Sequence, residues 1–151
     1  MIHHQRLQHQ FVQYIPEQLS IGVLYISIEY GTAAHSCCCG CGERVVTPFT
    51  PTDWKMTYDG ETVSLWPSIG NWTLACRSHY VIDRGRVLEA GPWTDKQVAA
   101  ERRRDKAAKA RHYDTLKSTE SVAPPQPDNS AQPTVQGLLS RVRRWTMRPR
   151  R

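Results

Sequence analysis

The sequence predicts a mainly β protein: a small antiparallel β domain followed by one helix and a disordered basic tail. Short β-branched and aromatic runs separated by turn residues predict the strands. The distribution of charge predicts where the β domain ends. Residues 1–93 hold 6 Lys and Arg against 8 Asp and Glu, whereas residues 94–151 hold 14 Lys and Arg against 6 Asp and Glu. All five cysteines also precede residue 94, so the packed body is expected in the first segment.

Four segments of the first 93 residues predict strands. Residues 21–30, IGVLYISIEY, form an apolar run that is typical of a buried strand, and residues 43–49, ERVVTPF, predict a second. Asp59 and Gly60 separate two alternating runs and predict a two-residue type I′ hairpin, since that turn needs positive φ at both positions. Gly85 predicts a further hairpin, so we expect a meander of antiparallel strands.

The pattern changes from the period of a strand to that of a helix after Trp93. Thr94 and Gln97 have the spacing of a capping box, which predicts that a helix of about 20 residues begins here. Its apolar residues are mostly alanine, which favours the helix and leaves little to bury. The predicted units are therefore a β domain over 9–93, a charged Ala-rich helix over 94–117, and a disordered Pro-rich linker with a basic tail over 118–151.

The first 20 residues are too polar for a signal peptide, and no stretch of about 20 apolar residues predicts a membrane span. We therefore expect a cytoplasmic protein. In a reducing compartment, clustered cysteines are more often metal ligands than disulfides, and the odd number of cysteines favours the same interpretation.

The stretch HSCCCGCGE at residues 35–43 predicts a metal loop. One histidine and three cysteines alternate in it: His35, Cys37, Cys39 and Cys41. On a straight strand these side chains would spread over about 20 Å, too far for one ion. Gly40 and Gly42 allow a tight bend, and Cys76 is the one distant thiol that the fold could bring back. Tetrahedral zinc suits such thiolate ligands.

Three zinc ligands are expected from the spacing, namely Cys39, Cys41 and Cys76. The fourth position stays open among three residues, of which the first is favoured: Cys37, Cys38 and His79. The alternative is that the cysteines are small buried side chains without a metal. The zinc interpretation completes the expected fold class, a zinc-stabilised β domain.

Three motifs in order, HSCCCGCGERVVTP, DGETVSLWPSIGNW and CRSHYVI, resemble a small bacterial family of unknown function with an H-x-C-x-C-G-C-G loop and a P-S-I-G-N-W loop. The resemblance covers residues 9–93. Genes of that family often lie beside bacterial ubiquitin-like conjugation genes, in loci linked to antiphage defence. The resemblance implies a serine-type, deubiquitinase-like peptidase that processes the ubiquitin-like protein, with that protein or its conjugation enzymes as partners.

The resemblance also implies which residues are functional. The motif cysteines correspond to Cys37, Cys39, Cys41 and Cys76, whereas Cys38 occupies a variable position. Three further residues fall on motif positions: His35, Ser68 and His79. The helix and the tail match nothing in the family.

Ser68 is the candidate nucleophile, because Gly70 follows it and frees the backbone to present amides to an oxyanion. His79 or His35 would be the base, oriented by Asp59 or Asp83. The alternative is that Ser68 and its neighbours only shape a turn. A metallopeptidase is disfavoured, since H-E-x-x-H is absent and four protein ligands leave no position for water.

The basic tail admits two interpretations. Its arginines could bind nucleic acid nonspecifically through phosphate contacts, or they could simply be solvated. The alternative function for the whole chain is a non-catalytic zinc-ribbon-like binding module, whose basic tail contacts nucleic acid or a conjugation enzyme.

Overall fold

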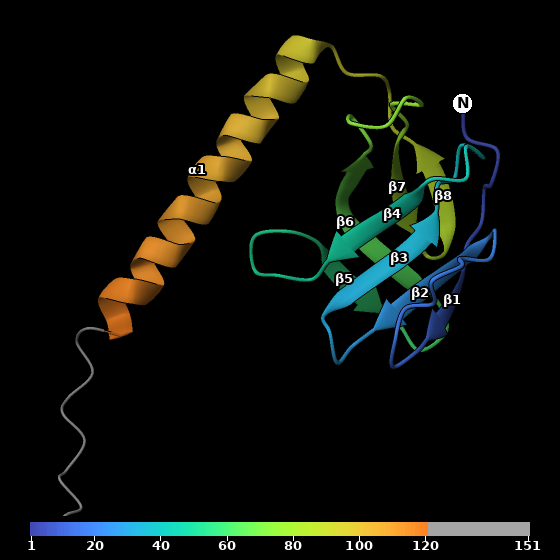
Figure 1. The fold of residues 1–151 in the computed structure, drawn as a ribbon, viewed down its shortest axis with the longest axis horizontal. Helices are drawn as coiled ribbons and strands as arrows, with labels where there is room; N and C mark the ends of the chain where they lie inside the picture. Colours follow the sequence, from blue (N-terminus) through green and yellow to red (C-terminus); the bar gives the residue numbers. More distant parts are fainter. Residues whose placement is uncertain (121–151) are drawn as a thin grey trace, which may run out of the picture.

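A computed structural model describes residues 1–120 of the 151-residue chain, and these form two four-stranded sheets and one long helix (Figure 1). The predicted mainly β fold class is confirmed. The basic tail and most of the linker predicted for 118–151 lie outside the described residues.

The first sheet contains β1 (Gln8–Phe11), β2 (Val23–Ser27), β3 (Thr32–Ser36) and β4 (Arg44–Pro48), in that spatial order. The β2–β3 and β3–β4 pairs are antiparallel, whereas β1 lies parallel to β2. The single strand predicted over 21–30 is wrong in its length, because β2 ends at Ser27 and a turn leads into β3. Gly31 in that turn has φ +54°, a conformation that glycine adopts without steric cost.

The second sheet is an antiparallel meander of β5 (Lys55–Tyr58), β6 (Val63–Gly70), β7 (His79–Asp83) and β8 (Arg86–Glu89). The predicted hairpin at Asp59 is present, but its predicted two-residue type is wrong. Its loop spans residues 59–62, and the Asp59 carboxylate accepts hydrogen bonds from the amides of Glu61 and Thr62. Positive φ at two adjacent positions occurs instead in the β7–β8 turn, at Arg84 and Gly85.

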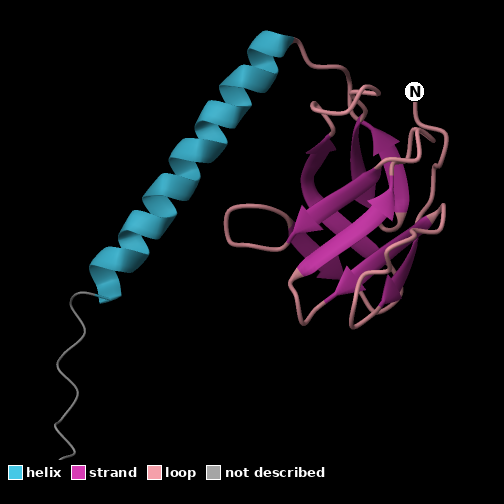
Figure 2. Cartoon of the chain, in the orientation of Figure 1, coloured by secondary structure: helices cyan, strands magenta, loops and turns pink. Residues whose placement is uncertain are grey.

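The two sheets pack face to face as a sandwich (Figures 1 and 2), and their inward side chains form one core. Leu24 and Ile26 from β2 contribute to the same cluster as Leu65 from β6 and Ile82 from β7. The core alternates along β6, where Ile69 is buried and its neighbours are more exposed. Ser68 and Gly70 therefore lie on the outer face of the second sheet.

Helix α1 (Asp95–Glu120) follows the second sheet and extends beside the sandwich (Figure 2). The predicted capping box is confirmed: the Thr94 amide donates to Gln97 Oε1 at 2.8 Å, and the Gln97 amide donates to Thr94 Oγ1 at 3.3 Å. Lys109 fixes the middle of α1 to the β4–β5 loop through an ion pair of 2.7 Å with Asp53. No helix within residues 1–120 is long and apolar enough to cross a membrane.

Candidate active site and metal centre

Ser68 and His79 form a hydrogen-bonded pair on the outer face of the second sheet. Their positions follow from the pairing of β6 with β7, in which three residues of β6 between Leu65 and Ile69 face a single residue of β7. Beyond this irregularity, Gly70 pairs with His79. Ser68 thus lies diagonally across from His79, and its Oγ is 2.9 Å from His79 Nε2.

A backbone carbonyl fixes the orientation of the His79 ring. Nδ1 lies 2.9 Å from the carbonyl oxygen of Gly91, which can only accept, so Nδ1 carries the proton. In the neutral ring Nε2 is then an acceptor and receives the hydrogen bond of the Ser68 hydroxyl. From the sequence, Asp59 or Asp83 was expected in this orienting role. Neither contacts His79: Asp59 bonds within its own turn and Asp83 accepts from Ser64.

Two indole rings enclose the imidazole. Trp72 and Trp93 stack at 5.5 Å, and their ring centroids lie 4.9 and 5.0 Å from that of His79. Trp72 packs directly over Gly70, where a Cβ atom would collide with the indole. The ring of His79 is thereby held between a carbonyl and two aromatic surfaces, and its residue is only 7% exposed.

His35, the other candidate base, lies elsewhere. It points from β3 into the core, where its Nε2 is 2.7 Å from the Tyr80 hydroxyl. Its side chain is fully buried, and burial lowers the pKa of His35 to about 4, so it is neutral at pH 7. Tyr80 neighbours His79 in β7 but points to the opposite face of the sheet. The structure therefore brings Ser68 together with His79 and not with His35.

Four thiols meet at one end of the sandwich. The loop after β3 supplies three of them and the β6–β7 loop the fourth, and their sulfur atoms all lie within 4.8 Å of one another: Cys37, Cys39, Cys41 and Cys76. Cys37 Sγ is 3.4 Å from Cys39 Sγ and 3.9 Å from Cys76 Sγ. This group could hold one metal ion. The positive φ of Gly40 and Gly42, +84° and +81°, produces the bend that brings the thiols together.

The other two candidates for the fourth ligand do not join this group. Cys38 is buried in the apolar core, where burial raises the pKa of its thiol to about 12, and His79 bonds to Ser68. Within the thiol group, burial raises the pKa of Cys39 to about 12. Burial also acts to raise that of Cys76, but hydrogen bonds from Ser78 and neighbouring thiols outweigh it and lower the pKa of Cys76 to about 7. Four thiolates so close together repel one another, so a bound cation would stabilise their ionised form.

A buried polar network connects the thiol group to the base. Ser78, the residue before His79, places its Oγ 3.2 Å from Cys37 Sγ and accepts a hydrogen bond of 2.9 Å from Asn71 Nδ2. Asn71 Nδ2 also lies 3.4 Å from the Tyr80 hydroxyl. Asn71 and Ser78 bound the loop between the two catalytic candidates, so the thiol group and this network fix both ends of that loop.

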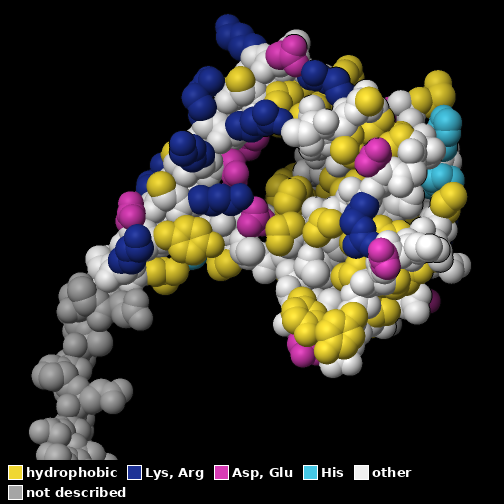
Figure 3. All heavy atoms as spheres, viewed as in Figure 1, with side chains coloured by type: hydrophobic (Ala, Val, Ile, Leu, Met, Phe, Trp, Pro, Cys, Tyr) yellow, Lys and Arg dark blue, Asp and Glu magenta, His cyan; other side chains and the backbone are white. Residues whose placement is uncertain are grey.

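A cavity of about 360 Å³ adjoins the pair of Ser68 and His79. Its walls come from β6, from the β4–β5 loop with Trp54, from Trp72 and Trp93, and from α1. Figure 3 shows the opening between α1 and the two sheets. This volume is in the range of small-ligand and peptide sites.

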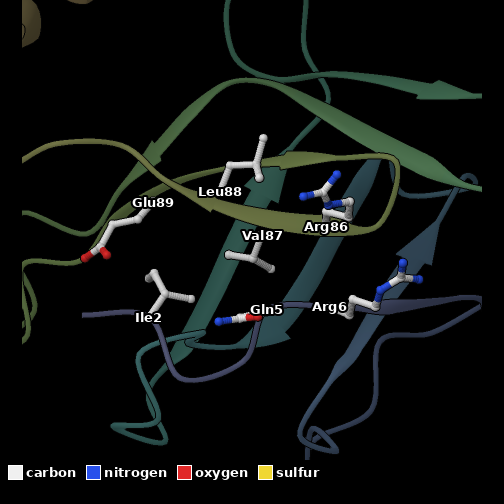
Figure 4. Close-up of a pocket in the computed structure, with 7 residues that line it drawn as sticks. All are labelled: Ile2, Gln5, Arg6, Arg86, Val87, Leu88 and Glu89. Carbon is white, nitrogen blue, oxygen red and sulfur yellow. The ribbon is translucent and has the colours of Figure 1, made fainter.

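A larger cavity of about 870 Å³ lies between the N-terminal segment and β8 (Figure 4). Its lining is drawn in Figure 4 and consists of Ile2, Gln5, Arg6, Arg86, Val87, Leu88 and Glu89. None of these residues is a hydroxyl or thiol nucleophile, so the cavity beside Ser68 is the better candidate active site.

The sequence model of one protein family, described as the bacterial ubiquitination-like system serine protease (BubE), matches residues 11–90. The chain belongs to the BubE family. The match covers just over half of the 151 residues and includes Ser68, His79 and the four clustered cysteines. The BubE match ends before α1. Searches of curated proteins and of solved structures gave no match.

Several residues of the candidate site were not predicted from the sequence. Gly91 acts through its backbone carbonyl, which leaves no trace in residue type. Ser78 was visible in the sequence CRSHY, two residues after Cys76 and immediately before His79, and that position was the available signal. The walls contributed by Trp93 and α1 depend on how the chain folds back after β8.

Proposed function

We propose that this BubE-family protein is a serine-type peptidase that acts on the C-terminal tail of the ubiquitin-like protein of its system. The observation that carries the proposal is the hydrogen bond of 2.9 Å between Ser68 Oγ and His79 Nε2, with Nδ1 oriented by the Gly91 carbonyl. A hydroxyl nucleophile, a base and an orienting group are the components of serine hydrolase sites on unrelated folds. Here a carbonyl takes the place that a carboxylate often has.

In the proposed reaction His79 Nε2 accepts the hydroxyl proton while Ser68 Oγ bonds to the carbonyl carbon of the scissile amide. The carbon–nitrogen bond then breaks, and the imidazolium returns the proton to the leaving amine. Water hydrolyses the resulting serine ester with His79 again as base, which releases the carboxylate and restores the hydroxyl. The protonated ring would remain bonded to the Gly91 carbonyl throughout.

We propose that the four clustered thiols hold a structural zinc ion. Four cysteine ligands fill a tetrahedral shell, which suits zinc and leaves no position for a catalytic water. Zinc would supply positive charge that keeps the thiolates ionised, and it would thereby hold the β6–β7 loop against the loop after β3. The chemistry itself is assigned to Ser68 and His79.

The description of the family as a serine protease of a bacterial ubiquitination-like system supports the proposal of a substrate from that system. The test is cleavage of that ubiquitin-like protein carrying additional residues after its C-terminal tail, followed by mass spectrometry. Wild-type protein should release the extension and Ser68→Ala should not. Ser64→Ala is the matched control, because Ser64 lies on the same strand and contacts Asp83 and Arg84 instead of a histidine. Equal activity of the Ser68→Ala variant and wild type would refute the proposal, and binding without any cleavage would favour a non-catalytic binding module.

A further inference from the structure

Strand β6 has an unpaired edge beside Ser68. On one side, β7 pairs with β6 up to Gly70. On the other side, β5 pairs with Val63 to Trp66 and begins only at Lys55, opposite Trp66. Within residues 1–120, the segment from Pro67 to Gly70 therefore has a neighbouring strand on one side alone.

The hydrogen-bond pattern shows which backbone groups point to the open side. The Asn71 amide donates to the Ser78 carbonyl at 2.9 Å, and the His79 carbonyl accepts from the amide of Ala90, the residue after β8. Bonding alternates along an antiparallel pair, so the amide and carbonyl of Gly70, which face His79 in a non-bonded pair, point away from β7. Ser68, two residues earlier, precedes the regular part of this pairing and lines the same cavity as Gly70.

The position beside this edge is a cavity and not a strand. If β5 extended further towards its N-terminal side, residues 51–54 would lie opposite the segment from Pro67 to Gly70. The chain turns away instead, because the Trp54 amide donates to the Pro48 carbonyl and the Asp53 amide to that of Thr50. The space left open is the cavity of about 360 Å³, which both Ser68 and Gly70 line.

Helix α1 forms the wall of this cavity opposite the β6 edge, and the space between the edge and the helix is called the slot below. Five of its residues line the cavity at helical spacing, on one face of the helix: Val98, Glu101, Arg102, Asp105 and Lys109. Lys109 holds that face towards the β4–β5 loop through Asp53. The slot is thus open along the β6 edge, bounded by α1, and closed at one end where β5 begins.

We propose that the substrate's extended tail binds here by strand addition: it pairs antiparallel with β6 at Ser68 and Gly70, in line with β5. This inference rests on the proposed function, which supplies the tail as the occupant. A cavity of about 360 Å³ between a strand edge and a helix suits an extended chain end better than a globular surface. Main-chain pairing would hold the tail while its side chains alternate between the sheet face and solvent.

The test measures binding of a synthetic peptide with the sequence of the ubiquitin-like protein's C-terminal tail to the Ser68→Ala variant, which cannot cleave it. N-methylation of the peptide's amides, one at a time, should weaken binding about tenfold at every second position and little at the positions between, because only alternate amides face β6. Addition of the peptide should also slow hydrogen exchange of the Gly70 amide. A methylation profile without this alternation, or no peptide binding, would overturn strand addition.

A second test keeps Ser68 and His79 unchanged and places a bulky side chain in the slot. Thr52→Trp should abolish peptide binding, since Thr52 lines the cavity. Thr57→Trp is the control, because Thr57 is exposed, lies further along β5 and does not line this cavity, and it should bind as wild type does. Cleavage of the substrate is measured separately. An alternating methylation profile without cleavage would support strand addition and refute the peptidase function. Cleavage without an alternating profile would refute strand addition alone.

Discussion

Ser78 Oγ lies 3.2 Å from Cys37 Sγ, and Ser78 immediately precedes His79. Ser78 therefore links the two sites: its hydroxyl contacts the thiol group, and the next residue along the chain is the candidate base. Asn71, at the other end of the same loop, donates to Ser78 and follows Gly70 of β6. The proposed metal centre and the proposed catalytic pair are consequently expected to respond to perturbation together.

Loss of one thiol ligand should therefore abolish both metal binding and cleavage. Wild-type protein purified under reducing conditions should contain about one zinc per chain, and its free energy of unfolding should include the metal's binding energy. Cys76→Ser should lose the zinc, melt at a lower temperature and lose activity, because the β6–β7 loop then no longer fixes His79. Elemental analysis, thermal melting and the cleavage assay measure these three effects.

Cys38→Ala provides the matched control for that variant. Cys38 is buried in the core outside the thiol group, so its replacement should keep the zinc and the activity. It should cost only the small amount of stability expected for a minor cavity. Metal-free wild-type protein, or metal loss in the Cys38→Ala variant, would disprove the assigned ligand set.

Replacement of the two histidines should separate catalysis from stability. His79→Ala should abolish cleavage and retain zinc, since His79 is bonded to Ser68 and lies outside the thiol group. His35→Ala should instead lower the free energy of unfolding by about 1–3 kcal/mol, because it removes the buried hydrogen bond of 2.7 Å to the Tyr80 hydroxyl. Cleavage rates and denaturant unfolding of both variants check this. Full activity in His79→Ala with none in a folded His35→Ala would reverse the assignment.

Detachment of α1 should weaken substrate binding more than it slows the chemical step. Lys109→Ala removes the ion pair with Asp53 and should raise KM several-fold with a smaller change in kcat, because α1 forms a wall of the cavity and does not contact the reacting pair. Lys106→Ala is the control, as Lys106 is exposed and is not among the lining residues. An identical effect of the two substitutions would show that total charge matters and the contact does not.

The same ion pair predicts a pH window for the docking of α1. Burial acts to raise the pKa of Asp53, but hydrogen bonds from Lys109 and Thr50 outweigh it and lower that pKa below its ordinary value. The hydrogen bond that Lys109 donates to Asp53 raises the pKa of Lys109. The stabilisation of the docked helix by Asp53 is thus complete above the ordinary carboxyl pKa and is lost as the pH falls through the lowered value. That by Lys109 is complete below the ordinary amine pKa and is lost as the pH rises through the raised value.

Hydrogen exchange of α1 measures this docking across pH, after correction for the intrinsic exchange rate. Protection of α1 should stay constant from mildly acidic to mildly basic pH and fall at both extremes. The Lys109→Ala variant should lack this dependence. A surface ion pair contributes at most about 1 kcal/mol, so the change in protection should be modest.

Local chemistry made much of the fold and of the metal centre predictable from the sequence. Gly40 and Gly42 indicated the bend in the thiol loop, and the spacing of Thr94 and Gln97 placed the start of α1 correctly. The turn at Asp59 was assigned the wrong type, because the carboxylate bonds to its own loop and creates a longer turn than the Asp-Gly pair alone suggests.

The arrangement of the candidate active site depended on tertiary structure. The irregular pairing between Leu65 and Ile69 determines that Ser68 meets His79, and no feature of the strand sequence specifies it. Two candidate bases remained open in the sequence because both fall on motif positions. The burial of His35 beside Tyr80 becomes visible only when the two sheets pack together.

The central claim is that His79 activates Ser68 as a nucleophile, and covalent labelling tests it most directly. A serine-reactive fluorophosphonate loses fluoride as the attacking oxygen bonds to phosphorus, and intact-mass and peptide mass spectrometry locate the adduct. We expect one adduct per chain, on Ser68, with labelling abolished in a zinc-loaded His79→Ala variant and unaffected in the Ser64→Ala variant. Absence of labelling in zinc-loaded wild-type protein that nevertheless cleaves its substrate, or an adduct on another residue, would contradict it.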